Sequence, residues 1–270
     1  MTAGEHTGAN SRIHTIRTTE PTDLDGIVDL YPVESDHPVP AVLILPGGGF
    51  REHTAHNGEG YARWFNRIGL AAVVLRYALV PDPFPVSLQQ ARRAYQGLLD
   101  GLIPGVDPQR IGVIGSSAGG LLAGLLATGS VLSIEEPPVP APLPRPAFHI
   151  QSYGVADLAL LPEPAVRGLL GDSMHLAGEL SPARHVDEWT PPTFVWATAQ
   201  DPPGLPNALE WTRALSAAEV PVELHVFPDG GHGVGLADGV AHGPHGHESL
   251  PHTAQWSRAC ETWLHHIGIL

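Results

Sequence analysis

Cysteine and basic residues are scarce in this chain. Cys260 is the single cysteine among 270 residues, so no intramolecular disulfide is possible and cysteine usage says nothing about the redox compartment. Lysine and arginine together number 14 against 28 acidic residues, which gives a formal net charge of −14. So acidic a chain is a poor match for nucleic acid or for an anionic membrane surface, and we expect neither as a partner.

Long apolar runs are also missing. No stretch approaches the ~20 apolar residues that a membrane-spanning helix needs. The first residues, MTAGEHTGANSR, lack the apolar core of a signal peptide. We therefore expect a cytoplasmic protein. Hydrophobic residues make up 43% of the chain, no linker divides it, and it shows no repeat. The prediction is a disordered segment over residues 1–12 and a single domain over 13–270.

Short apolar runs alternate with amphipathic segments in the first half of the chain. Residues 41–45 (AVLIL) and 70–75 (LAAVVL) are of strand length and predict strands buried on both faces. A helix is expected over 59–68, and another begins near Ser87, which we expect to cap it. This alternation predicts an α/β fold with a mainly parallel sheet, helices on both faces and no large lid domain. Further strands are expected over 13–18, 27–31, 148–153, 193–199 and 222–227, and further helices over 166–170, 207–215 and 253–267.

Two segments interrupt the alternation. Residues 131–146 contain six prolines and predict a stiff surface loop or a small cap. Residues 160–189 are polar and carry seven acidic or arginine side chains, which predicts a loop-rich insertion with little continuous apolar surface.

The stretch around Ser117 predicts a nucleophile. RIGVIGSSAGGLL reads as a strand, a sharp turn and a helix, with G-x-S-x-G in the turn. Gly115 and Gly119 flank Ser117 at the positions where a Cβ would collide with neighbouring backbone. Ser116 has no such flanks and is interpreted as a spacer. The alternative is a glycine-rich turn that binds phosphate or only packs.

An acid and a histidine follow two later strands. Active groups of parallel sheets gather past the carboxyl ends of the strands. Asp201 follows the strand expected over 193–199, and His232 follows the one over 222–227, so the order is Ser, Asp, His. Asp201 could instead open the turn before two prolines, and Asp229 is a rival acid only three residues from His232. The chain has 16 histidines, so the position of His232 after the last strand carries the argument.

Backbone donors for an oxyanion are also predicted. The residue after the nucleophile, Ala118, supplies one N–H. Another comes from the triplet Gly47-Gly48-Gly49 at the end of the strand over 41–45. The alternative is that this triplet only forms a tight turn.

A histidine-rich stretch, AHGPHGHESLPH, raises the question of a metal. Its spacing matches no closed zinc or nickel site, so the histidines are interpreted as ordinary loop residues and neither metal nor cofactor is expected. The residues concerned are His242, His245, His247 and His252, with Glu248.

Over residues 41–265 the chain resembles the α/β-hydrolase esterases, and among them the acetylxylan-esterase-like branch that includes carbohydrate acetylesterases and feruloyl-esterase-like enzymes. The matching stretches are LILPGGGF, NGEGYARW, VDPQRIGVIGSSAGGLLA, WTPPTFVWATAQD and PVELHVFPDGGHGVGL. The resemblance implies a triad of Ser117, Asp201 and His232, with Gly48, Gly49 and Ala118 as oxyanion donors. The chain departs from the pattern of its relatives at Pro46, Ala78, Ser116 and Pro202, around the substrate pockets.

Together these patterns predict a serine carboxylesterase that acts on acetyl to butyryl esters, with an acetylated sugar or similar small alcohol as natural substrate. Two alternatives stay open: a serine peptidase of the prolyl-peptidase type, which shares the triad order, and a non-catalytic binding protein on the same fold.

Overall fold

A seven-stranded sheet forms the centre of the protein in a computed structural model that describes residues 24–81, 83–133, 143–246 and 248–270. The strand order is β1-β3-β2-β4-β5-β6-β7, in which β1 is antiparallel to β3 and all other pairs are parallel. The predicted α/β fold with a mainly parallel sheet is therefore confirmed. The strands are β1 Val28–Tyr31, β2 Val39–Leu45, β3 Ala71–Leu75, β4 Val106–Ser116, β5 His149–Ser152, β6 Thr193–Thr198 and β7 Val222–Phe227.

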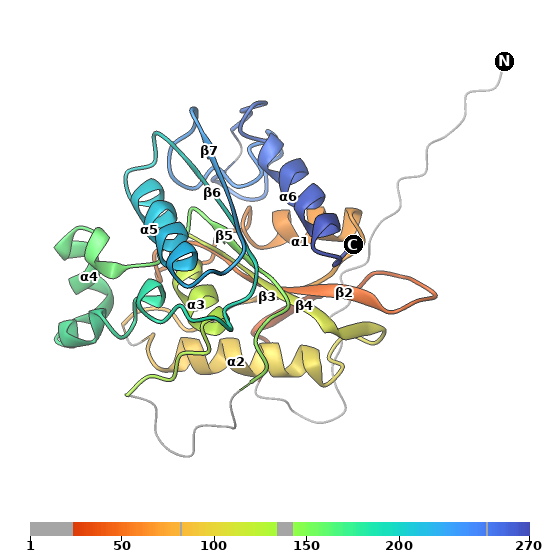
Figure 1. The fold of residues 1–270 in the computed structure, drawn as a ribbon, viewed down its shortest axis with the longest axis horizontal. Helices are drawn as coiled ribbons and strands as arrows, with labels where there is room; N and C mark the ends of the chain where they lie inside the picture. The colour runs from red at the N-terminus through yellow and green to blue at the C-terminus, as the bar shows by residue number, and fades with distance from the viewer. Residues whose placement is uncertain (1–23, 82, 134–142, 247) are drawn as a thin grey trace.

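Helices cover both faces of the sheet. Figure 1 shows α1 and α6 together on one face and α2 with α3 on the other. Trp64 of α1 meets Trp256 of α6 at 5.1 Å between ring centroids, and Trp256 in turn stacks on Trp196 of β6 at 4.6 Å. The helices are α1 Glu59–Arg67, α2 Val86–Leu99, α3 Ala118–Ala127, α4 Glu163–Leu170, α5 Gly204–Ala217 and α6 Gln255–His266.

The two central apolar runs are buried as the sequence predicts. Every residue from Ala41 to Leu45 is at most 1% exposed, and every residue of β3 at most 5%. Strands so enclosed can be apolar on both faces because helices cover each side. None of the helices in the described ranges combines the length and apolar content needed to cross a bilayer.

The cap predicted at Ser87 is wrong. Helix α2 begins at Val86, with Pro85 in the N-cap position, so Ser87 lies inside the first turn, where its side chain makes no capping hydrogen bond. Its hydroxyl is fully buried instead.

Three predicted segments lie outside the described residues: 1–12, 13–18, and 134–142 of the proline-dense segment. The single-domain organisation stays a prediction.

A buried histidine in β5 makes stability depend on pH. His149 is 0% exposed and lies edge-on to Trp211, with 5.4 Å between the ring centroids. Burial lowers the pKa of its imidazole from 6.5 to about 3. Between these values the unfolded chain binds a proton that the folded chain does not, so stability falls as pH drops from about 6.5 towards 3.

We predict that His149→Leu reduces this acid sensitivity. Between pH 7 and pH 4 the wild-type free energy of unfolding should fall by a few kcal/mol more than that of the variant. Urea denaturation at several pH values measures the difference. His266→Gln, at an exposed position in the last turn of α6, serves as control and should follow the wild type. Parallel pH profiles for wild type and His149→Leu would contradict the prediction.

Candidate active site

Ser117 occupies the sharp turn between β4 and α3. Its φ of 49° lies in the left-handed region, which costs a non-glycine residue about 1–3 kcal/mol. A Cβ at Gly115 would lie 2.4 Å from the carbonyl oxygen of Gly119, and one at Gly119 would lie 2.0 Å from that of Leu45. Both contacts are impossible for real side chains, so the predicted steric need for glycine on either side of Ser117 is confirmed. Ser116 is only 1% exposed.

The side chains of Ser117, His232 and Asp201 form one hydrogen-bonded chain. Ser117 Oγ lies 2.6 Å from His232 Nε2. On the other side of the ring, Nδ1 lies 2.9 Å and 2.8 Å from the two carboxylate oxygens of Asp201. Asp201 is 2% exposed, whereas the imidazole keeps a third of its surface exposed. This arrangement lets the imidazole accept the serine proton while the carboxylate fixes its tautomer.

The loops that follow β6 and β7 carry the acid and the histidine. Asp201 also accepts a hydrogen bond from the N–H of Gly204 at 2.8 Å, which ties it to the start of α5. A Cβ at Gly204 would lie 2.2 Å from Asp201 Oδ2, so only glycine allows this approach. The rival acid, Asp229, is exposed, and its carbonyl oxygen accepts a hydrogen bond from Thr253 Oγ1 at 2.7 Å.

The glycine triplet at the end of β2 passes close to Ser117. A Cβ at Gly47 would lie 3.2 Å from the Ser117 Cβ, and Gly48 has a φ of 128° that side chains disfavour. No residue in the described ranges accepts a hydrogen bond from the N–H of Gly48, Gly49 or Ala118. Within the described part of the chain these three groups have no hydrogen-bond acceptor, and their role as oxyanion donors stays a prediction.

Two pockets meet at Ser117 and His232. One has a volume of about 540 Å³, the other about 220 Å³, and both are bordered by Gly49. The larger pocket is the more polar of the two and is called the polar pocket below; its walls include Glu52, Thr54, His56, Asn57, His245 and Glu248. The smaller pocket is apolar, with walls that include Leu121, Tyr153, Val155, Leu158, Leu161 and Leu169.

The insertion over 160–189 contributes apolar surface that its charges conceal in the sequence. Ala165 and Leu169, both of α4, and Leu161 just before it line the smaller pocket. Glu163 and Arg167 pair with each other on the outside at 2.6 Å. The insertion therefore does present a few apolar side chains to this pocket, because the charged and apolar side chains lie on opposite faces of α4. Whether it offers little continuous apolar surface elsewhere stays a prediction.

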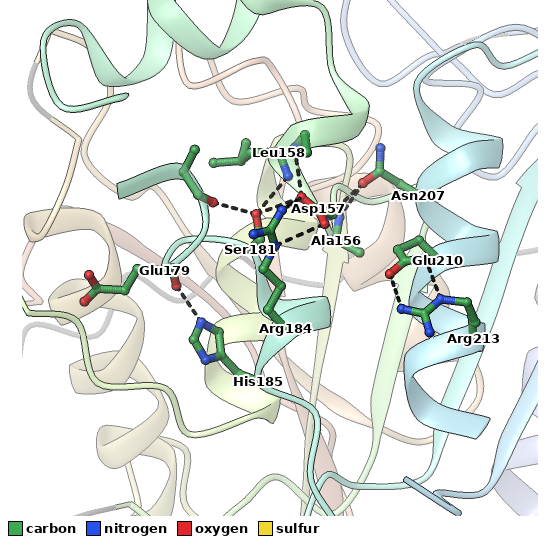
Figure 2. Close-up of polar contacts among 12 residues, drawn as sticks. Ala156, Asp157, Leu158, Glu179, Ser181, Arg184, His185, Asn207, Glu210 and Arg213 are labelled. Atoms are coloured by element: carbon green, nitrogen blue, oxygen red, sulfur yellow. Dashed lines mark hydrogen bonds and ion pairs between the residues drawn. The ribbon is translucent and has the colours of Figure 1, made fainter. Parts of the chain in front are cut away.

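Figure 2 shows a network of hydrogen bonds around Asp157, in the segment that also carries two residues of the apolar pocket, Val155 and Leu158. Asn207 Oδ1 of α5 accepts hydrogen bonds from the N–H groups of Ala156 and Asp157 at 2.8 Å and 2.9 Å. The Asp157 carboxylate accepts from the Ala159 N–H at 2.8 Å and from Ser181 Oγ at 3.1 Å. These contacts fix the segment that carries Val155 and Leu158 against α5.

The described residues of the histidine-rich stretch have different neighbours. His245 borders the polar pocket, whereas His252 lies against the ring of Phe227 at 5.7 Å. His242 lies against Gly60, where a Cβ would be 3.1 Å from its ring. His247 lies outside the described residues, and among those described no cluster of three metal-ligating side chains occurs. The expectation that no metal or cofactor is bound stays a prediction.

Residues 42–236 match the alpha/beta hydrolase fold family. The chain belongs to this family. Its fold is similar to that of an acetyl ester-xyloside bifunctional hydrolase from Caldicellulosiruptor lactoaceticus, with a TM-score of 0.79 and 34% identity over 90% of this chain and 88% of the other. The predicted resemblance to the esterase branch is thereby supported at the level of fold and sequence.

Two longer curated proteins are also similar to the chain. An acetylxylan esterase of Xylanibacter ruminicola is 25% identical over 207 residues, which make up 73% of this chain and 41% of that protein. Endo-1,4-beta-xylanase B of Butyrivibrio fibrisolvens is 29% identical over 207 residues, 73% of this chain and 33% of that protein. The chain therefore spans well under half the length of these relatives.

We predict that Asp201→Asn lowers kcat for p-nitrophenyl acetate by about 10⁴-fold, because the amide favours the wrong tautomer of the histidine. Steady-state kinetics of the purified variant measure the change. Asp229→Asn is the matched control and should stay within about threefold of the wild type, since this side chain is exposed. Near-normal rates for Asp201→Asn together with a large loss for Asp229→Asn would move the role of the acid to Asp229.

Proposed function

We propose that this protein is a serine carboxylesterase that hydrolyses short-chain acyl esters, including those of acetylated sugars, through an acyl-enzyme. The observation that carries the proposal is the chain of hydrogen bonds from Ser117 through His232 to Asp201, placed where the two pockets meet. A nucleophile, its base and an orienting carboxylate are the groups that acyl transfer needs.

In the proposed mechanism, Ser117 Oγ attacks the ester carbonyl while His232 Nε2 takes the hydroxyl proton. The tetrahedral oxyanion is stabilised by the N–H groups of Gly48, Gly49 and Ala118, and loss of one such donor costs about 3 kcal/mol in comparable enzymes. His232 then protonates the leaving alcohol. Water, deprotonated by the same imidazole, attacks the acyl-enzyme. The imidazolium then returns the proton to Ser117 Oγ as the acid is released.

The difference between the two pockets supports a separate place for each half of the ester. The apolar pocket of about 220 Å³ is smaller than the ~300 Å³ at which drug-sized ligand sites begin, and suits a short acyl chain. The polar pocket of about 540 Å³ offers the carboxylates of Glu52 and Glu248 and the imidazole of His245, which can bind hydroxyls of a sugar. Similarity to enzymes named for acetylated xylan and xyloside supports the same assignment.

We predict a maximum of kcat/KM at C2 to C4 on p-nitrophenyl esters from C2 to C16, without activation at a lipid interface. Each further methylene would need apolar surface that a pocket of about 220 Å³ does not supply, and so gains little of the ~0.8 kcal/mol available per buried CH₂. Acetate release from acetylated xylose and xylan tests whether the alcohol part of the ester is a sugar.

The outcomes of this screen separate the parts of the proposal. A maximum at C8 or longer would contradict the short acyl chain. A maximum at C2 without acetate release from acetylated sugars would agree with esterase activity and contradict a sugar as the alcohol. Hydrolysis of an aminoacyl-proline amide faster than of every ester would favour the peptidase, and no hydrolysis of any substrate would favour the binding protein.

A further inference from the structure

The hydroxyl oxygen of Tyr153 accepts hydrogen bonds from two loops that carry different parts of the site. Asn57 Nδ2 donates to it at 2.7 Å, and the backbone N–H of Gly235 donates at 3.2 Å. Asn57 lies in the segment between β2 and α1 that contains the glycine triplet. Gly235 lies in the loop after β7, three residues beyond His232. A single oxygen therefore joins the loop of the histidine to the loop of the expected oxyanion donors.

Tyr153 is itself held firmly. It directly follows β5, is 1% exposed and has a φ of 39°, in the left-handed region that a tyrosine rarely adopts. Its backbone N–H donates to the carbonyl oxygen of Trp196 at 2.8 Å, and its ring lies edge-on to the Trp196 ring at 5.0 Å. The same ring lies against His232, with 5.4 Å between centroids. Strained residues of this kind persist where the surroundings fix them, and they gather at functional sites.

Further hydrogen bonds connect Asn57 to the glycine triplet through Thr54. Thr54 Oγ1 donates to Asn57 Oδ1 at 2.8 Å, and the Thr54 N–H donates to the carbonyl oxygen of Gly47 at 3.1 Å. The hydroxyl of Tyr61 lies 3.5 Å from that of Tyr153 and 2.8 Å from Ser152 Oγ. Burial raises the pKa of Tyr153, so the phenol stays neutral.

We propose that Tyr153 is a positioning residue whose hydroxyl, through Gly235, fixes the loop of His232 where the imidazole reaches Ser117. The inference rests on the proposed function, since it assigns the hydroxyl a part in the same reaction. The hydroxyl touches none of the reacting atoms. It acts by holding the loop of His232 in one position. Without this acceptor, the buried Gly235 N–H and the Asn57 amide lose a common partner and the two loops lose their link.

The test compares Tyr153→Phe with Tyr61→Phe. Both substitutions remove one buried hydroxyl and keep the ring, but only the first removes the acceptor shared by Asn57 and Gly235. For Tyr153→Phe, kcat on p-nitrophenyl acetate should fall about 10- to 100-fold, as for other small displacements of catalytic groups. Its KM should stay within about twofold, because the ring that lines the apolar pocket is kept. For Tyr61→Phe, kcat should stay within about twofold of the wild-type value, even if this variant lowers the melting temperature as much as Tyr153→Phe does.

Two further measurements ask whether the effect passes through His232. In a His232→Ala background, adding Tyr153→Phe should change the residual rate by less than about twofold, since the group acted upon is gone. The low-field proton resonance of His232 Nδ1–H should broaden in Tyr153→Phe and stay sharp in Tyr61→Phe. An unchanged kcat for Tyr153→Phe, or an equal loss in both backgrounds, would overturn the inference.

Failure of this inference can be told from failure of the proposed function. If His232→Ala hydrolyses esters as fast as the wild type, the proposed triad is wrong. If His232→Ala is inactive while Tyr153→Phe and the wild type have equal kcat, the triad stands and only the role of the Tyr153 hydroxyl is refuted.

Discussion

The contact between the start of α3 and the end of β2 is the constraint on which the site depends. Leu45 at the end of β2 pairs with Gly115 of β4, and Gly119 lies so close to the Leu45 carbonyl oxygen that a Cβ there would come within 2.0 Å. Any side chain at that position would push α3 away from the sheet. Because the helix lies so close, Ser117 lies beside the glycine triplet that follows β2, so the proposed nucleophile and the expected oxyanion donors are close together.

Once Ser117 is fixed, the parallel sheet brings the other groups to it. Strands β6 and β7 run parallel to β4, so the loops after them open at the same edge of the sheet. Asp201 accepts a hydrogen bond from Gly204 at the start of α5, and the loop of His232 donates one to the Tyr153 hydroxyl through Gly235. Among the described residues, Phe50, Ser117 and Tyr153 have positive φ and border the smaller pocket, so local strain gathers around the serine.

The sequence predicts those parts of the structure that depend on short-range patterns. The runs AVLIL and LAAVVL become buried strands, and the glycines around Ser117 mark the turn because the steric conflict involves close neighbours in the chain. The Ser87 cap fails since the exact first residue of a helix depends on the preceding proline-rich turn. Contacts that cross the chain are invisible to such patterns: nothing near Tyr153 in the sequence indicates that Asn57 and Gly235 share its hydroxyl. For the same reason the charges of α4 hide its apolar face, since which face turns towards Ser117 is decided by packing.

The central claim is that Ser117 is the nucleophile, and covalent trapping tests it most directly. Incubation with a p-nitrophenyl alkylphosphonate, followed by peptide mass spectrometry, identifies the side chain that attacks. The account predicts one adduct per chain, on Ser117, absent from Ser117→Ala, present in Ser116→Ala and formed much more slowly in His232→Ala. An adduct on Ser116 or on a residue outside the site, or no adduct from an enzyme that hydrolyses esters, would contradict it.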